Sequence, residues 1–125
     1  MLTQARVMPT IPVVDFERAK KFYEGQLGLR PARPATPDGI MYECGGGTHI
    51  FLYPRAPSKA DHTVASFVVD DLEASVKALR ARGIVFEEYD FPGLKTINGI
   101  ATLGTEKAAW FKDTEGNILA VSQLL

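Results

Sequence analysis

Long apolar runs and an excess of charge of either sign are both missing from this chain of 125 residues. No apolar stretch approaches the roughly 20 residues that a membrane-spanning helix needs, so we expect no membrane partner. The 14 lysines and arginines nearly balance the 15 aspartates and glutamates, and the basic residues form no cluster. Nucleic-acid binding needs a concentrated basic face, so we do not expect a nucleic-acid partner either.

Cysteine is also scarce, because Cys44 is the only one and no internal disulfide can form. This composition suits a reducing compartment. The N-terminal stretch MLTQARVMPT lacks the apolar core of a signal peptide, and we expect a cytoplasmic protein. No activating partner stands near Cys44 in the sequence, so we interpret it as a small buried hydrophobic residue rather than a nucleophile.

What the chain does contain is one pattern in two copies. The first copy begins with PVVDFERAKKFYEGQLGL, where Asp15 suits a helix N-cap and apolar residues recur at helical spacing. The second begins with VVDDLEASVKALRARGIV, where Asp71 takes the same role. Two copies are too few for a solenoid, so we predict a paired, pseudo-symmetric α+β domain. It covers residues 1–125, with module one at about 5–55, a linker at about 54–61 and module two at about 62–125.

Short apolar stretches bounded by turn residues predict the strands of both modules. Strands are expected at residues 5–14, 40–44, 48–53, 63–69, 85–88, 100–103, 107–111 and 118–124. One helix is expected to start at Phe16 and to end at Gly25 or Gly28, and the other covers residues 72–82. Residues 89–99 are expected to form a long loop, which is either a lid over a binding site or a plain connection.

A hairpin loop is expected from Asp113 to Asn117, because turn chemistry explains these residues better than an incomplete calcium loop does. A five-residue loop there pairs Lys112 with Ile118 and therefore Trp110 with Ala120. Cross-strand partners share a face, so Trp110 is predicted to stand beside Ala120 on the open face of the sheet. The alternative pairing of Phe111 with Ile118 turns Trp110 into the core.

Three stretches of the chain resemble the signatures of the vicinal oxygen chelate superfamily, which includes glyoxalase I, bleomycin-resistance proteins and extradiol dioxygenases. They are PVVDFERAKKFYEGQLGL, VVDDLEASVKALRARGI and WFKDTEGNILAV, and they occur in the family's order over nearly the whole chain. The resemblance implies two βαβββ modules whose sheets curl together into one open, cup-shaped sheet. In the family's enzymes the floor of the cup holds a divalent metal.

The resemblance places the family's metal ligands at Met8, Phe51, Val64 and Ala120. None of these suits a hard or borderline divalent ion, because a thioether is a soft ligand and the other three side chains offer no donor. A catalytic metal usually needs about three protein ligands. We therefore expect no metal and no cofactor. A two-residue shift along the strands keeps the face and offers His49 and His62 instead.

A mostly apolar and aromatic set is predicted to face the cup, from strand alternation and from the resemblance. The set is Met8, Thr10, His49, Phe51, Tyr53, Val64, Ser66, Trp110, Ala120 and Ser122. This composition suits a pocket for a flat organic molecule; alternatively, the side chains fill the cup and leave no cavity. His49 is either a ligand-binding or acid–base group or a hydrogen-bonded residue at the rim.

Three functions are compatible with these features. The leading hypothesis is a protein of the bleomycin-resistance type that binds a small hydrophobic or aromatic compound without a metal. The second is a metal-dependent lyase, isomerase or dioxygenase of the glyoxalase type with a shifted ligand set, such as His49 with Glu43 or His62. The third is a non-catalytic oligomerising or regulatory module. An open, aromatic-lined sheet and the habit of the family also favour a homodimer.

Overall fold

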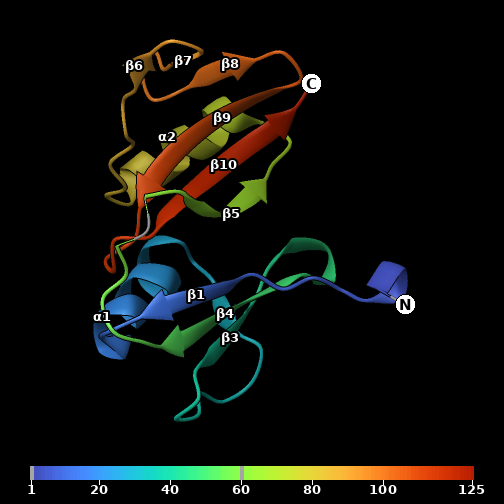
Figure 1. The fold of residues 1–125 in the computed structure, drawn as a ribbon, viewed down its shortest axis with the longest axis vertical. Helices are drawn as coiled ribbons and strands as arrows, with labels where there is room; N and C mark the ends of the chain where they lie inside the picture. The colour runs from blue at the N-terminus through green and yellow to red at the C-terminus, as the bar shows by residue number, and fades with distance from the viewer. Residues whose placement is uncertain (1, 60) are drawn as a thin grey trace.

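A computed structural model describes residues 2–59 and 61–125 and folds them into two modules of the same topology (Figure 1). Each module has a strand, a helix and three further strands. The sheet orders are β1-β4-β3-β2 and β5-β10-β9-β8, and in both sheets the first strand lies parallel to the last. The α+β class and the paired βαβββ modules are confirmed.

The elements of module one are η1 (Leu2–Gln4), β1 (Thr10–Val13), α1 (Phe16–Lys20), η2 (Lys21–Gln26), β2 (Arg30–Pro31), β3 (Ile40–Glu43), η3 (Gly45–Gly47) and β4 (His49–Pro54). Those of module two are β5 (Thr63–Val68), α2 (Leu72–Ala81), β6 (Asp90–Phe91), β7 (Leu94–Lys95), β8 (Ala101–Leu103), β9 (Glu106–Lys112) and β10 (Ile118–Leu124). None of the helices in the described part of the chain is long and apolar enough to cross a membrane.

Both helices begin as expected. The Asp15 carboxylate accepts a hydrogen bond from the Arg18 backbone N–H, and the Asp71 carboxylate accepts one from the Ala74 N–H. Each cap satisfies a donor that the first helical turn leaves free. After α1 the helical segment continues in the wider turns of η2. It is terminated at Gly28, whose φ of 73° lies in the left-handed region.

Four sequence expectations differ from the structure. The first strand begins at Thr10 rather than at residue 5, and the short strand β2 was not predicted. Residues 85–88 form no strand, because Phe86 makes only an isolated bridge with Phe111. The stretch 89–99 is not a plain loop, since it folds into the small β6–β7 hairpin.

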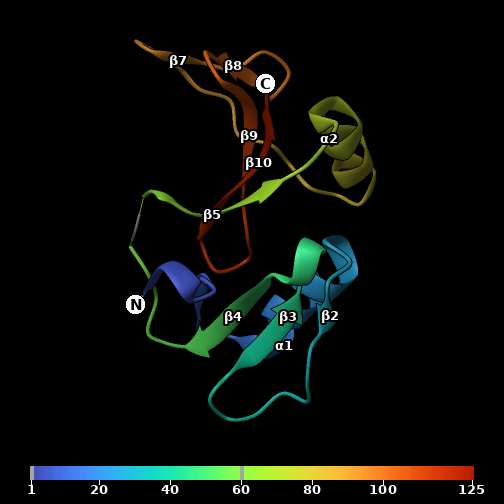
Figure 2. The same cartoon turned by 90° about the vertical axis from the view of Figure 1, so that its right-hand side faces the viewer.

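The expected single cup-shaped sheet is resolved into two sheets, and no strand of one pairs with a strand of the other among residues 2–59 and 61–125. In Figure 2 the module-two sheet is seen nearly edge-on while the module-one sheet faces the viewer more directly. β1 and β5 are each the edge strand of their sheet, and their outer edges have no strand partner among the described residues.

One hydrophobic core joins the modules on the helix side of both sheets. Its members include Leu52 of β4, Phe22 of η2 and Phe111 of β9. The rings of Phe22 and Phe111 belong to different modules, and their centroids are 6.3 Å apart. No helix among residues 2–59 and 61–125 covers the opposite faces of the sheets, as Figure 2 shows for β9 and β10. Those uncovered faces are called the open faces below.

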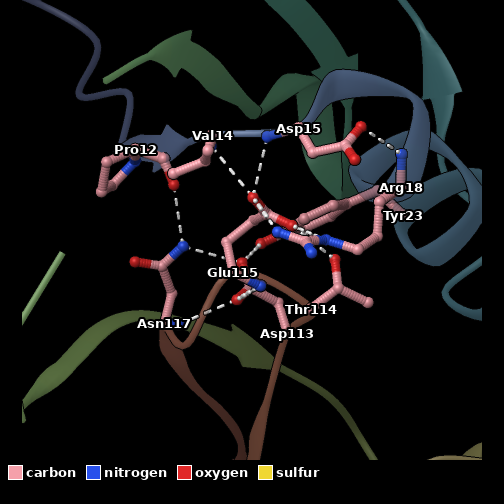
Figure 3. A network of polar contacts seen from close by, with 9 residues as sticks. All are labelled: Pro12, Val14, Asp15, Arg18, Tyr23, Asp113, Thr114, Glu115 and Asn117. Carbon is pink, nitrogen blue, oxygen red and sulfur yellow. Dashed lines mark hydrogen bonds and ion pairs between the residues drawn. The ribbon is translucent and has the colours of Figure 1, made fainter. Parts of the chain in front are cut away.

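The β9–β10 loop fastens module two to module one through a buried hydrogen-bond network (Figure 3). The Asp113 carboxylate accepts bonds from the Tyr23 hydroxyl at 2.7 Å, from the Asn117 side chain at 2.8 Å, and from the backbone N–H groups of Glu115 and Asn117, both at 2.8 Å. Burial and the charge of Asp113 raise the pKa of Tyr23, so its hydroxyl keeps the proton that it donates. Asn117 also donates to the backbone oxygen of Pro12, at 3.0 Å.

Glu115 makes the second connection. Its carboxylate accepts from the backbone N–H groups of Val14 and Asp15, at 2.9 and 3.0 Å, and pairs with the Arg18 guanidinium at 2.7 Å. Burial alone would raise the pKa of Glu115, but the bonds from Arg18 and from the two backbone groups lower it to about 2. We call Tyr23, Asp113, Glu115 and Asn117 the hairpin clamp.

Candidate ligand-binding site

Trp110 lies on the open face of module two. Lys112 pairs with Ile118 and Trp110 with Ala120, which confirms the register expected from the five-residue loop and excludes the alternative one. The next residue, Phe111, is buried in the core on the helix side. Successive residues of a strand point to opposite faces, so the indole of Trp110 stands on the face without a helix.

Small side chains surround Trp110 on this face. Ala120 pairs with Trp110 on one side and with Ser66 of β5 on the other. The hydroxyls of Ser66 and Ser122 lie 2.9 Å apart. Ala120 and Ser122 are only 4% and 5% exposed, yet neither projects far from the sheet. The result is a shallow shelf with two hydroxyls, bordered by an indole.

Tyr89 forms a second wall, which the sequence did not predict. Its ring meets that of Trp110 edge to face, with centroids 5.5 Å apart, and it also contacts Phe91. Thr96 holds the backbone of Tyr89 in place through three hydrogen bonds. Burial and the neighbouring Glu87 raise the pKa of Tyr89, so its phenol stays protonated and is able to donate a hydrogen bond.

The open face of module one carries a second group of aromatic residues. Phe51 of β4 pairs with Thr10 on one side and with Met41 on the other, and His49 pairs with Glu43. Tyr53 continues the same face, and all three β4 side chains are half-buried. Alternation along β4 thus places His49, Phe51 and Tyr53 as predicted.

A groove of about 640 Å³ runs between the two modules. His49 lines it from module one and Ser66 from module two, so the structure brings these two predicted residues together. Its other lining residues are Val7, Pro9, Cys44, Gly45, Thr48, Ile50, Ala65, Phe67, Val68 and Val69. The groove and the Trp110 shelf share Ser66, so they form one continuous candidate site.

Five of the predicted residues lie outside the groove and the shelf. Thr10, Phe51 and Tyr53 belong to the sheet of module one and line neither of them. Met8 precedes β1 and is 38% exposed, and it does not line the groove. Val64 packs against the hydrophobic core rather than facing the cup. The register between β5 and β10 shifts close to it, and such an irregularity interrupts the alternation on which the prediction relied.

The residues at the family's metal positions do not fit a divalent metal. Phe51, Val64 and Ala120 have no donor atom, and Met8 offers only a thioether. The shifted set supplies the pair Glu43 and His49, but His62 is exposed and does not line the groove. No cluster of three potential metal ligands occurs within residues 2–59 and 61–125. Burial raises the pKa of Cys44, which disfavours a thiolate.

Comparisons with known proteins agree with this architecture. The chain is 30% identical over 121 residues to a glyoxylase-like domain-containing protein of Didymella fabae, covering 89% of this chain and 87% of that one. TnmS3, an antibiotic-binding protein from Streptomyces sp. CB03234, superposes with a TM-score of 0.65 at 22% identity, over 98% of this chain and 99% of that one. Lactoylglutathione lyase from Agrobacterium tumefaciens superposes with a TM-score of 0.67 at 20% identity, over 96% of this chain and 93% of that one.

These two solved structures establish the fold alone at such identities. The family rests on the sequence, because the profile of one superfamily matches residues 4–121. The chain belongs to the Glyoxalase/Bleomycin resistance protein/Dioxygenase superfamily.

Proposed function

We propose that this protein binds a small hydrophobic or aromatic compound on the open face of module two, without a bound metal. The observation that carries the proposal is the pair of Trp110 and Tyr89 beside the shelf of Ala120, Ser66 and Ser122. The indole offers a flat aromatic surface to a planar molecule, and the two serine hydroxyls beside it offer hydrogen bonds. Stacking on such a ring contributes on the order of 1 kcal/mol beyond the burial of area.

The groove supplies the polar contacts of the same site. Trp110 and Ser66 lie on strands separated by β10, so they are about 10 Å apart at the usual strand spacing. A flat compound that stacks on Trp110 therefore reaches the hydroxyls of Ser66 and Ser122, and a longer one reaches His49. A few polar groups in an apolar site orient a ligand without determining most of its affinity.

Sequestration fits this site better than turnover. Its members supply hydrogen bonds and aromatic surface, whereas the positions that hold a metal in the family's enzymes have lost their donors. TnmS3, with the same fold, is described as antibiotic-binding, which supports a binding role here. The cross-strand pair of Glu43 and His49 is the one observation that favours a metal-dependent lyase, isomerase or dioxygenase.

A second copy of the chain completes the proposal. Both sheets have an open face, and the edges of β1 and β5 are unpaired in the described residues. A homodimer would cover part of these surfaces and enclose the ligand. We place this protein in the cytoplasm. Neither a nucleic acid nor a membrane belongs to this scheme, because no basic cluster and no long apolar stretch occurs in the sequence.

Planar aromatic compounds are expected to quench the fluorescence of Trp110 saturably, because it is the only tryptophan. In Trp110→Ala, binding measured by calorimetry should weaken about tenfold or more, a loss of about 1.4 kcal/mol. Trp110→Phe keeps an aromatic ring and should retain most of the affinity. A blue-shifted emission that neither acrylamide nor any compound changes would show that Trp110 is a core residue.

Metal analysis separates the two candidate functions. Protein purified without a histidine tag is expected to contain well under one zinc, nickel, manganese or iron ion per chain, because the family's four ligand positions lack suitable donors. One equivalent of metal that survives dialysis, and that is lost in His49→Ala, would favour the enzyme instead.

A further inference from the structure

A second cavity lies on the opposite side of the sheet from Trp110. This helix-side cleft has a volume of about 310 Å³ and lies between α2 and the residues that follow η2. Phe111 of β9 forms part of its floor, Leu27 and Leu29 form one wall, and Ala78 and Leu79 of α2 form the other. Phe111 and Trp110 are consecutive in β9, so the cleft and the Trp110 shelf lie on opposite faces.

The internal repeat explains why the cleft exists. Asp71 corresponds to Asp15 as a helix N-cap, and at the same offset Ala78 corresponds to Phe22. Phe22 is buried and packs against Tyr23 and Phe111. At the matching position in α2 there is no ring, and Ala78 is one of the residues that line the cleft. Packed cores leave few gaps of this size.

One charged group stands at this apolar cavity. Arg82 lines it, and its guanidinium lies against the backbone of Gly28, where a Cβ would be only 3.1 Å from Nη1. The Arg82 carbonyl accepts a hydrogen bond from Gln26, which ties this end of α2 to module one. Within the described residues, no ion pair involves Arg82. The guanidinium is therefore free to bind an anion.

We propose that the helix-side cleft binds a medium-chain aliphatic carboxylate. The hydrocarbon chain lies between Leu27, Ala78 and Phe111, and the carboxylate pairs with Arg82, whose forked donors match its two oxygens. The volume is at the lower end of the range for ligand pockets, which suits a short chain. The site is separate from the aromatic-compound site and does not depend on it.

Calorimetric titration of the full-length protein with octanoate at constant salt tests the proposal, with octan-1-ol as the uncharged control. Octanoate is expected to bind saturably, with one molecule per chain. Octan-1-ol should bind about fivefold more weakly, because it lacks the partly exposed ion pair with Arg82. Arg82→Gln should weaken octanoate about fivefold and leave octan-1-ol unchanged. Arg33→Gln removes an exposed arginine that does not line the cleft, and it should change neither.

Ala78→Phe tests the cavity itself, because it places in α2 the side chain that module one has at Phe22. Octanoate binding should fall at least tenfold while the melting temperature is kept or raised. If this variant does not fold, Arg82→Gln decides alone, since Arg82 is exposed. Absence of octanoate binding, or binding that neither substitution weakens, overturns the proposal. Binding lost in Trp110→Ala would also overturn it, because the ligand would then occupy the open face.

Discussion

Asp113→Ala is expected to lower the free energy of unfolding by about 3 to 5 kcal/mol. Asp113 is only 7% exposed, and its carboxylate accepts four hydrogen bonds. Alanine leaves the donors of Tyr23, Glu115 and Asn117 without partners in a place that water reaches poorly. Because one carboxylate holds both the loop and the contact with module one, its loss acts on both at once. Urea unfolding followed by circular dichroism measures the change.

Two variants calibrate that result. Tyr23→Phe removes one of the four hydrogen bonds to Asp113 and should lower the free energy of unfolding by about 1 kcal/mol. Asp38→Ala removes an exposed carboxylate from the loop before β3 and should change the stability by less than about 0.5 kcal/mol. An Asp113→Ala protein that unfolds at the same urea concentration as Asp38→Ala would show that the hairpin clamp contributes little.

Residues 1–58 produced alone are expected to remain unfolded. The core of module one is shared with module two, since Phe22 contacts Phe111 and Tyr23 donates to Asp113. Without module two, these buried rings and the apolar face of α1 are exposed to water, and one small sheet with one helix buries too little surface to compensate. Far-UV circular dichroism and NMR dispersion of the fragment test this.

Adding residues 59–125 to the fragment is the matching control. If the modules stabilise each other as the shared core indicates, the mixture should regain structure that neither piece has alone. A fragment of residues 1–58 that unfolds cooperatively as a well-dispersed monomer would contradict the paired-module account.

Local rules predicted the parts of the fold that depend on local contacts. Asp15 and Asp71 were recognised as caps because a cap acts within three residues of itself. Trp110 was paired with Ala120 because loop length determines hairpin register. Val64 was misplaced because the register shift between β5 and β10 leaves no signal in a single strand.

Contacts between segments that are distant in the sequence were not predicted. Turn chemistry accounted for Asp113, Glu115 and Asn117, and it is correct for the bonds inside the loop. Their bonds to Tyr23, to Pro12 of β1 and to the residues just before α1 span 90 to 105 positions of the chain, which no local pattern encodes. Tyr89 was missed for the same reason, because its segment reaches β9 through long-range contacts: the bridge between Phe86 and Phe111, and the hydrogen bond from the Glu87 N–H to the Trp110 backbone oxygen.

The most direct test of the proposed ligand site is the indole N–H signal of Trp110. A single tryptophan gives one such peak in a nitrogen–proton correlation spectrum of labelled protein. On titration with a planar aromatic compound that binds, this peak and the amide peaks of Ser66, Tyr89 and Ala120 should move together and saturate at one compound per chain. If a compound binds and the Trp110 indole peak stays in place while other residues shift, the ligand site is not on this face of the sheet.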